Sequence, residues 1–438
     1  MKQQILQSIS KCTIAYAIML ILFTSLIIGV QFVPQAKTNH HIYTAIKQIE
    51  QEGIDKQVGI QLPFFKLDNF TDCYMMNIIA SADTLHPTET AMMNYFHLDE
   101  RQLEKRNIAY QTEDVIKERN PNLPKQSYAR YWHGYQVTLR PMLFFMDYSA
   151  IRLTNYILFT LLTIGCTWLI KKKLNTSIAV FFILTLLLVG FPIIPLSLQF
   201  STCFYITLCS IFALLKYPWL SKKTEYLLTT FFIIGGITSY MDFLTTPQIT
   251  LGLPMAIHLL ASNKHKKCQL VIFISIAWFA GYASIWASKW MMAYLLTQHN
   301  VMAEVTEAAV CRSSDYVFGK HMTIANILTT IAHVVIKHHL LGKLWIVGMF
   351  FIGIIFVYIK MIPNKKVFLN NLYLLLIVAI IPTWYLALRN HSLLHYWFTW
   401  RACWVVLFCL LSFVYNTCSW KQLQISFKRL LNKRKHDI

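Results

Sequence analysis

Residues 12–33, CTIAYAIMLILFTSLIIGVQFV, decide the class of fold. This run carries no charged side chain, and a helix needs about 20 apolar residues to cross a hydrocarbon core roughly 30 Å thick. Lys2 and Lys11 precede the run, as basic residues precede a signal peptide. A signal peptide, however, has an apolar core of about 7 to 15 residues and a small-residue cleavage site, whereas this run is longer and ends in QFVPQ. We therefore expect it to be retained as a transmembrane helix.

Similar apolar runs recur along the rest of the chain, which is 56% hydrophobic and 14% charged. Nine further spans are predicted, at residues 151–170, 177–194, 199–215, 226–240, 248–261, 269–287, 344–359, 368–388 and 402–417. The fifth and sixth of the ten spans are short and are joined by MDFLTTPQ, so they could instead form a broken or re-entrant pair. The predicted fold class is an all-α polytopic membrane protein with about ten transmembrane helices and a large helical first external loop.

Charged residues divide unevenly between the two sides of such a bundle. The chain has 40 Lys and Arg but only 20 Asp and Glu. With ten spans, one side of the membrane carries 20 Lys and Arg but only two acids, Glu225 and Asp437. The other side carries 20 Lys and Arg and 18 Asp and Glu. Because cytoplasmic loops are enriched in Lys and Arg, we expect a multi-pass protein of the cell membrane with both termini in the cytoplasm. The net charge of +20 is then a topology signal, and nucleic acid is not an expected partner.

The sequence predicts four parts. Residues 1–36 form the first transmembrane helix, 37–149 an external loop domain with amphipathic helices, 150–420 the transmembrane bundle with a second external loop at 289–343, and 421–438 a basic cytoplasmic tail. The inner loops hold little except lysine, so they lack the carboxylates and glycine-rich loops that nucleotide chemistry requires. Any chemistry is therefore expected on the external face.

The first external loop begins with an amphipathic pattern from Thr38 to Gln51 and continues into the segment LPFFKLDNFTDCYMMNIIAS. Asp68 and Asp72 stand near the start of the short helix that this segment predicts. An acid in that position can act as a general base, or it can only cap the helix. Both interpretations are open from the sequence.

The segment SYARYWHGYQVTLRP, which ends just before the second span, carries Arg130, His133 and Arg140 among aromatic residues. One interpretation is a belt of aromatic and basic side chains at the level of the lipid headgroups. The other is a binding site, in which aromatic faces contact a sugar or a polyprenyl chain and arginine binds phosphate.

Three charged residues beside later spans are further candidates. Asp242 lies in SYMDFLTTP at the outer end of the fifth span, where it is either a functional carboxylate or a helix-end group. Lys289 in WASKW, at the outer end of the seventh span, either extends to the headgroups or binds phosphate. Arg312 lies in the outer loop that follows and is a candidate phosphate ligand.

The densest group of polar residues is RNHSLLHYWFTWR, between the last two spans on the outer face. Its candidates are Asn390, His391, His395 and Arg401. The two histidines are four residues apart and would share one face of a helix, where they could bind phosphate, orient a carboxylate or ligate a metal. The motif does not supply the further ligands that a metal needs, so no metal site is predicted. Packing or interfacial anchoring is the alternative.

This layout resembles the integral-membrane glycosyltransferases of the GT-C class. The segments TDCYMMN, YARYWHGYQVTLRP, SYMDFLTTP, WASKW and NHSLLHYWFTWR are similar to motifs of a group of bacterial GT-C-like membrane proteins. The layout covers essentially the whole chain and the motifs about a fifth of it. The acidic pair that the class carries near the end of the first span is absent, since the first external acids are Glu50, Glu52 and Asp55.

The resemblance implies sugar transfer from a polyprenyl-phosphate-linked donor to a glycan or lipid acceptor, beside membrane lipids and without a nucleotide cofactor. Asp72, or else Asp68, would be the general base, and His133 would assist proton transfer. Arg130, Arg140, Asp242, Lys289, Arg312, Asn390, His391, His395 and Arg401 would line the substrate and phosphate site. A divalent cation is compatible with this chemistry but not required by it.

Three other functions compete with sugar transfer. Spans with scattered polar groups and a broken fifth and sixth pair also fit a transporter or flippase for a lipid-linked or envelope substrate. However, no internal repeat relates the two halves, and the intramembrane carboxylates of a proton-coupled carrier are lacking. A membrane acyltransferase with an embedded histidine and a non-catalytic envelope assembly protein are the remaining alternatives.

Overall fold

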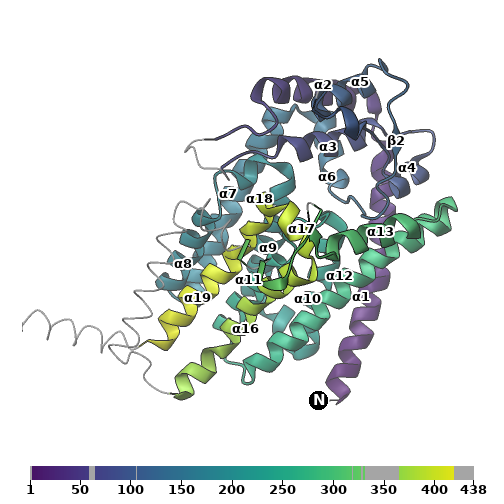
Figure 1. The fold of residues 1–438 in the computed structure, drawn as a ribbon. Coiled ribbons are helices and arrows are strands. Elements are labelled where there is room, and N and C mark those ends of the chain that lie inside the picture. The colour runs from purple at the N-terminus through teal and green to yellow at the C-terminus, as the bar shows by residue number, and fades with distance from the viewer. Residues whose placement is uncertain are drawn as a thin grey trace, which may run out of the picture.

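The computed structural model describes residues 2–58, 65–104, 106–317, 319–326, 329–330 and 365–418. The predicted eighth span, 344–359, and the predicted basic tail, 421–438, lie outside these residues. Figure 1 shows a bundle of long helices with a layer of shorter helices stacked on one end. The N-terminus lies at the opposite end of the bundle from this layer. The layer is built from the segment that the sequence predicts as the first external loop.

Six segments of the described chain are long and apolar enough to cross a membrane. They comprise α1 (Lys2–Gly29) with η1 (Val30–Phe32), α7 (Tyr148–Lys173), α9 (Leu198–Lys216), α12 (Lys267–Thr297), α16 (Lys365–Ala387), and α18 (Tyr396–Thr399) with η5 (Trp400–Ala402) and α19 (Cys403–Thr417). Four of them, α1, α7, α12 and α16, carry exposed leucine or isoleucine side chains. The chain therefore has the architecture of an all-α membrane protein.

Three apolar helices fall outside this set: α8 (Thr176–Leu188), α10 (Thr224–Met241) and α11 (Ile249–Ala261). Helices α8 and α11 have 13 residues each, which is about 20 Å of helix and less than the hydrocarbon thickness. All residues of α11 from Ile249 to Leu259 are buried, and the helix packs against α9, α10, α12, α16 and α19. Helix α11 is thus a core helix, and helix lengths alone do not establish the predicted number of ten spans.

Helices α10 and α12 cross at a pair of glycines. A β-carbon added to Gly235 on α10 would stand 2.0 Å from the carbonyl oxygen of Trp278, and one added to Gly281 on α12 would stand 2.0 Å from that of Phe232. The two backbones therefore touch, as small residues allow in membrane helix pairs. This contact anchors α12, which carries one wall of the candidate site.

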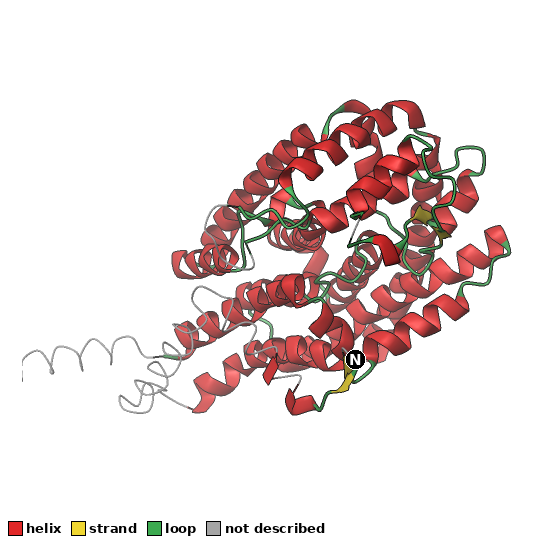
Figure 2. Ribbon diagram, turned by 45° about the horizontal axis from the view of Figure 1, so that its top comes forward, coloured by secondary structure: helices red, strands yellow, loops and turns green. Residues whose placement is uncertain are grey.

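The layer on the bundle is a small helical domain. Its elements are α2 (Gln35–Glu52), α3 (Asn69–Ala80), α4 (Pro87–Met93), β1 (Phe96–His97), η2 (Glu100–Gln102), α5 (Ile108–Ile116), β2 (Lys125–Gln126) and α6 (Gln136–Phe145). The predicted amphipathic helix is confirmed as α2, with Ile42, Ala45, Ile46 and Ile49 buried. The antiparallel pair of β1 and β2 is one of only two small sheets among the described residues, and Figure 2 shows how strongly helices dominate.

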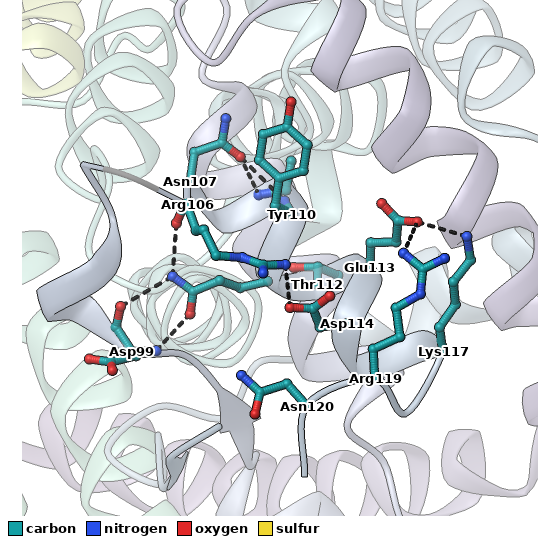
Figure 3. Close-up of polar contacts among 12 residues, drawn as sticks. Asp99, Arg106, Asn107, Tyr110, Thr112, Glu113, Asp114, Lys117, Arg119 and Asn120 are labelled. Atoms are coloured by element: carbon teal, nitrogen blue, oxygen red, sulfur yellow. Dashed lines mark hydrogen bonds and ion pairs between the residues drawn. The ribbon is translucent and has the colours of Figure 1, made fainter. Parts of the chain in front are cut away.

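The charged residues of this domain are paired rather than simply solvated. Around α5, Arg106 donates a hydrogen bond to Asp114 at 2.6 Å, and Lys117 donates one to Glu113 at 2.7 Å. Figure 3 shows both contacts. Lys47 on α2 also donates to Glu113, at 2.6 Å. The carboxylate hydrogen bonds from Lys117 and Lys47 lower the pKa of Glu113 to about 2. These ion pairs join α5 to α2 on the outer surface of the domain.

Three short elements complete the described bundle on the side of the layer. Helix α13 (Met302–Ser313) follows α12 and leads into the hairpin of β3 (Tyr316–Val317) and β4 (Lys320–His321). The short helix α17 (Arg389–Leu394) packs against α13 and β3. The remaining short helices are η3 (Ile194–Leu196) and η4 (Pro218–Ser221).

Candidate functional site

An apolar groove of about 780 Å³ runs between α12, α13 and α16. Its described lining includes Trp278, Tyr282 and Trp286 from α12, and Trp384 from α16. Along α12 the lining extends from residue 271 to residue 286, which is about 22 Å of helix. The groove is therefore long and largely apolar, with aromatic rings in its wall, and suits a hydrocarbon chain.

The groove ends at two arginines below the helical layer. Arg130 and Arg312 both line it. Arg130 donates to Glu304 at 2.9 Å, and its guanidinium lies 4.1 Å from the ring centre of Tyr128. Arg312 lies 5.3 Å from the ring centre of Tyr131, and no carboxylate of the described residues is within ion-pair distance of it. Arg312 thus presents an uncompensated positive charge to the groove.

Aromatic side chains hold these arginines in place. Tyr131 stacks on Trp286 with ring centres 5.9 Å apart and an interplanar angle of 4°. Trp286 donates its indole N–H to the carbonyl of Arg130 at 2.7 Å, and Trp290 donates to the same carbonyl at 3.2 Å. Trp286 therefore lines the groove and fixes the backbone of Arg130, and Tyr131 stacks against it.

The predicted histidine pair lies close to the same end of the groove. His391 donates through Nε2 to the carbonyl of Leu244, a groove residue, at 2.8 Å. The rings of His391 and His395 are 4.7 Å apart, and the Nδ1 atom of each is buried without a partner in the described structure. Burial, together with the positive charge of Arg312, lowers the pKa of His395 to about 4. Both rings are neutral at pH 7 and can accept a hydrogen bond.

Asp242 stabilises the turn that brings Leu244 to the groove. Its carboxylate accepts from the backbone N–H groups of Leu244 and Thr245, at 2.9 Å each, and from the Thr245 hydroxyl at 2.5 Å. The side chain is buried, and burial raises the pKa of Asp242 above its ordinary value. Leu244 has φ of 78°, a strained value for this residue type. The helix-end role that the sequence allows for Asp242 is therefore present, beside the groove.

Asp72 lies on α3 at the start of α9. It accepts from the hydroxyl of Tyr148 at 2.5 Å and from the backbone N–H of Leu198 at 3.3 Å. It therefore caps α9 from a neighbouring helix. Burial raises the pKa of Asp72 to about 6, although the positive charge of Arg152 opposes this. A pKa near the working pH suits a general base.

Asp68 caps its own helix. Its carboxylate accepts from the backbone N–H of Thr71 at 3.1 Å and from the Thr71 hydroxyl at 2.8 Å. Arg401 is also buried there, with its guanidinium 3.9 Å from the ring centre of Phe200 on α9. Burial raises the pKa of Asp68, and the positive charge of Arg401 acts in the opposite direction. The structure thus brings Asp68, Asp72 and Arg401 together around the start of α9.

Arg152, which the sequence did not single out, joins this acidic region to α2. It donates to Glu52 at 2.8 Å and to Asn69 at 2.6 Å. Burial alone would raise the pKa of Glu52, but the hydrogen bonds from Arg152 and Gln48 lower it to about 2. Glu52 is therefore ionised and fixes the layer to α7.

Lys289 and Arg140 have backbone and amide partners away from the groove. Lys289 is a buried residue of α12. The helix continues to Thr297, whereas the sequence predicted a loop from residue 289. It donates to the carbonyls of Ala91 and Met92, at 3.1 and 2.6 Å, at the carboxyl end of α4, where a cation is favoured. Arg140 donates to Gln31 and Gln35, at 2.6 Å each, and so attaches α6 to the junction of α1 and α2.

His133 and Asn390 have positioning contacts as well. His133 donates to the carbonyl of Tyr128 at 3.1 Å, and burial, together with the charge of Lys289, lowers its pKa to about 3. Asn390 donates to the carbonyl of Tyr316 at 2.8 Å and attaches α17 to the hairpin. The described residues contain no group of three or more His, Cys, Asp or Glu side chains that could hold a metal ion.

The groove itself was missed at the sequence level, although a signal was present. Trp278, Tyr282, Trp286 and Trp290 follow one another at intervals of four, a spacing that places aromatic rings on one face of a helix. That face of α12 became recognisable only once α13 and α16 were seen beside it.

The fold and this site define an all-α membrane protein with an open apolar groove below a helical layer. Comparisons of the chain with protein-family models, with curated proteins and with solved structures find no match.

Proposed function

We propose that the chain is a membrane glycosyltransferase of the GT-C type. It transfers a sugar from a polyprenyl-phosphate-linked donor to an acceptor, a cell-envelope glycan or lipid, on the external face of the membrane. The observation that carries the proposal is the apolar groove between α12, α13 and α16, which ends at Arg130 and Arg312. A groove of this kind matches a ligand with a hydrocarbon chain and an anionic head.

The donor fits the groove by its chemistry. A prenyl chain has no polar group along its length, and the groove wall is aromatic and aliphatic for about 22 Å. The phosphate at the end of the prenyl chain is negatively charged and can pair with Arg312, which has no ion-pair partner among the described residues. A planar guanidinium can donate two parallel hydrogen bonds to phosphate oxygens, which is why arginine suits this position.

The reaction requires a base and a stabilised leaving group. A carboxylate takes the proton from the acceptor hydroxyl as that oxygen forms its bond to the anomeric carbon of the sugar. The bond between this carbon and the phosphate oxygen breaks, and polyprenyl phosphate leaves with the negative charge that Arg130 and Arg312 stabilise. Asp72 is the base expected from the sequence, and burial raises its pKa to about 6, but it does not line the groove. Asp242 is the competing candidate because its turn lines the groove.

The proposed topology puts the reaction outside. In the arrangement of ten spans with both termini in the cytoplasm, the helical layer and the arginine end of the groove face the exterior. The lysine-rich ends of α7, α9 and α10 then face the cytoplasm, in line with the bias of cytoplasmic loops toward Lys and Arg.

A photoreactive polyprenyl phosphate tests the donor site. Membranes containing the chain are irradiated with this probe, and the labelled peptides are mapped. We expect labels on α12 and α16, and we expect Ala379→Trp, which fills the exposed groove wall, to prevent labelling. The control Leu161→Trp lies on the exposed face of α7 and should label like the unmodified protein. Equal labelling of both variants would contradict the donor site.

Sugar transfer is measured in the same membranes. They are loaded with radiolabelled polyprenyl-phosphate-linked sugars extracted from the host, and radiolabel in glycan and lipid products is counted. Membranes with the chain should produce a labelled product that membranes without it lack. If labelled lipid only changes leaflet and no product forms, the proposed transfer is wrong.

A further inference from the structure

The end of the bundle opposite the helical layer contains two further cavities, which the proposed sugar transfer does not use. The first, of about 670 Å³, is lined by the ends of α10 and α12 and by Gln7 of α1. The second, of about 850 Å³, is a groove between α1, α10 and α12. Thr224, His265 and Leu270 line both, so the two cavities adjoin each other.

The first cavity is strongly basic. Lys222, Lys223 and Lys264 line it, and the one acid among its described lining residues is Glu225, which is buried and 4.0 Å from Lys223. The ammonium nitrogen of Lys264 is buried and has no hydrogen-bond partner in the described structure. The charge of Glu225 acts on Lys264, but no anion hydrogen-bonds its ammonium group in the described structure, which favours the binding of an added anion.

Two helices also begin at this cavity. Helix α10 starts at Thr224 and α12 at Lys267, and neither has a side-chain cap. The first N–H groups of a helix lack partners within the helix and carry partial positive charge, so they attract anions. The lysines and both helix ends therefore favour the same kind of ligand, a phosphate group.

The second cavity supplies the apolar half of the site. It is lined by Ile9 and Tyr16 of α1, Phe232 of α10, and Phe273 and Ala280 of α12. On α12 the lining extends from residue 269 to residue 284, about 22 Å of helix. One leaflet of hydrocarbon is roughly 15 Å thick, so an acyl chain fits within the groove.

We propose that this end of the bundle binds one anionic phospholipid, with its phosphate among Lys222, Lys223 and Lys264 and one acyl chain in the groove between α1, α10 and α12. The site lies at the other end of the bundle from Arg312 and does not depend on the proposed sugar transfer. By the proposed topology it faces the inner leaflet, where the phospholipid both fills the groove and pairs the buried lysine.

Native mass spectrometry and binding of a tail-labelled lipid test the proposal. The purified, delipidated protein is mixed with phosphatidylglycerol or phosphatidylcholine in detergent. We expect phosphatidylglycerol to bind at least tenfold more tightly, and the triple variant K222Q/K223Q/K264Q to lose this preference, since each lysine near a membrane surface adds to the attraction for anionic lipid. Ala280→Trp should weaken both lipids by filling the groove.

The matched control is K171Q/K172Q/K173Q, which removes the same charge from the exposed end of α7, a helix that packs against α8 and α9. It should keep the preference for phosphatidylglycerol. If the triple variant misfolds, the single variant Lys222→Gln is used, and it should show a partial loss. Equal affinity for the two lipids, or equal loss in the control, overturns the proposal. Displacement of the lipid by millimolar inorganic phosphate would also overturn it, because it would reveal a site for a soluble anion.

Discussion

Two buried acids, Asp72 and Asp242, differ in the hydrogen-bond partners of their carboxylates. Asp242 accepts three hydrogen bonds from its own turn, so its charge is committed to holding that turn. Asp72 shares its carboxylate between Tyr148 and the first N–H groups of α9. Because these partners come from two other helices, protonation of Asp72 affects contacts between elements and not only within a loop.

Asp72→Asn should lower sugar transfer by about 100-fold or more, because general base catalysis contributes typically 10² to 10⁴. Burial raises the pKa of Asp72 to about 6, so the ionised carboxylate that acts as the base is present mainly above that pH. The transfer rate of the unmodified protein should therefore rise through about pH 6. The variant should show no such rise, and Asp83→Asn, an exposed acid of the same domain, should keep it. If Asp242→Asn removes the rise and Asp72→Asn does not, Asp242 is the base.

Arg312→Gln should raise the KM for the lipid-linked donor by about tenfold or more, since a hydrogen bond to a charged group contributes roughly 1.5 to 3 kcal/mol. The rate at saturating donor should change less, because the groove still holds the prenyl chain. Arg101→Gln is the control, as Arg101 is exposed in the helical layer. Unchanged KM in the Arg312 variant would place the donor phosphate elsewhere.

At the scale of elements, the contact of α10 with α12 matters most, because α12 forms walls of both the donor groove and the proposed phospholipid groove. The contact depends on backbone meeting backbone at Gly235 and Gly281. Lipid surrounds such a pair, so close packing, and not the hydrophobic effect, holds the two helices together.

Gly281→Ala should destabilise the protein by about 3 kcal/mol, because overpacking a tight contact forces the backbones apart. The measurement is thermal unfolding in detergent, with photolabelling of the donor groove as a second readout. Gly165→Ala is the control, since its β-carbon would meet Phe212 at an ordinary 3.4 Å. Similar melting temperatures for the two variants would show that α10 and α12 tolerate separation.

Glu52→Gln should lower stability by about 3 kcal/mol, because it removes the carboxylate that forms an ion pair with the buried Arg152. The pKa of Glu52 is lowered to about 2, so the stabilisation is present above the ordinary glutamate pKa and is lost as the pH falls through about 2. Unfolding should be followed across this range for both proteins. The difference between them should shrink at the acid end, and a constant difference would contradict the role of the charge.

On the scale of the whole molecule, the helical layer and the lysine-rich helix ends lie at opposite ends of the bundle. This separation is a physical consequence of membrane insertion if lysines stay inside and the acidic layer stays outside. A prediction of sidedness follows, and it is independent of any enzymatic activity.

Leu85→Cys should react with a membrane-impermeant maleimide on intact cells, because Leu85 is 84% exposed in the helical layer. Lys171→Cys, at the opposite end of α7, should react only after the membrane is permeabilised. Both are made in a Cys311→Ser background, since Cys311 is an exposed thiol. Reaction of both positions on intact cells would contradict the proposed topology.

Much of the fold could be predicted from the chain alone, because its signals are local. Uncharged runs identified the long helices, and the spacing of Ile42, Ala45, Ile46 and Ile49 identified α2 with its buried face. The predicted helix boundaries were wrong where a residue distant in the sequence determines the end of a helix. Helix α12 continues past Lys289 because the carbonyls of α4 satisfy that ammonium group, and no local pattern reports such a partner.

The candidate site was predictable as a set of residue types but not as a geometry. Hydropathy and charge are properties of each segment, and they predicted that arginines, histidines and acids gather on one side of an all-helical bundle. Only the tertiary structure separated Lys289 and Arg140, which have carbonyl and amide partners, from Arg312, which lines a groove without an acid beside it in the described chain. The reason is physical: the role of a charged side chain depends on what surrounds it, and in this protein its neighbours come from helices distant in the chain.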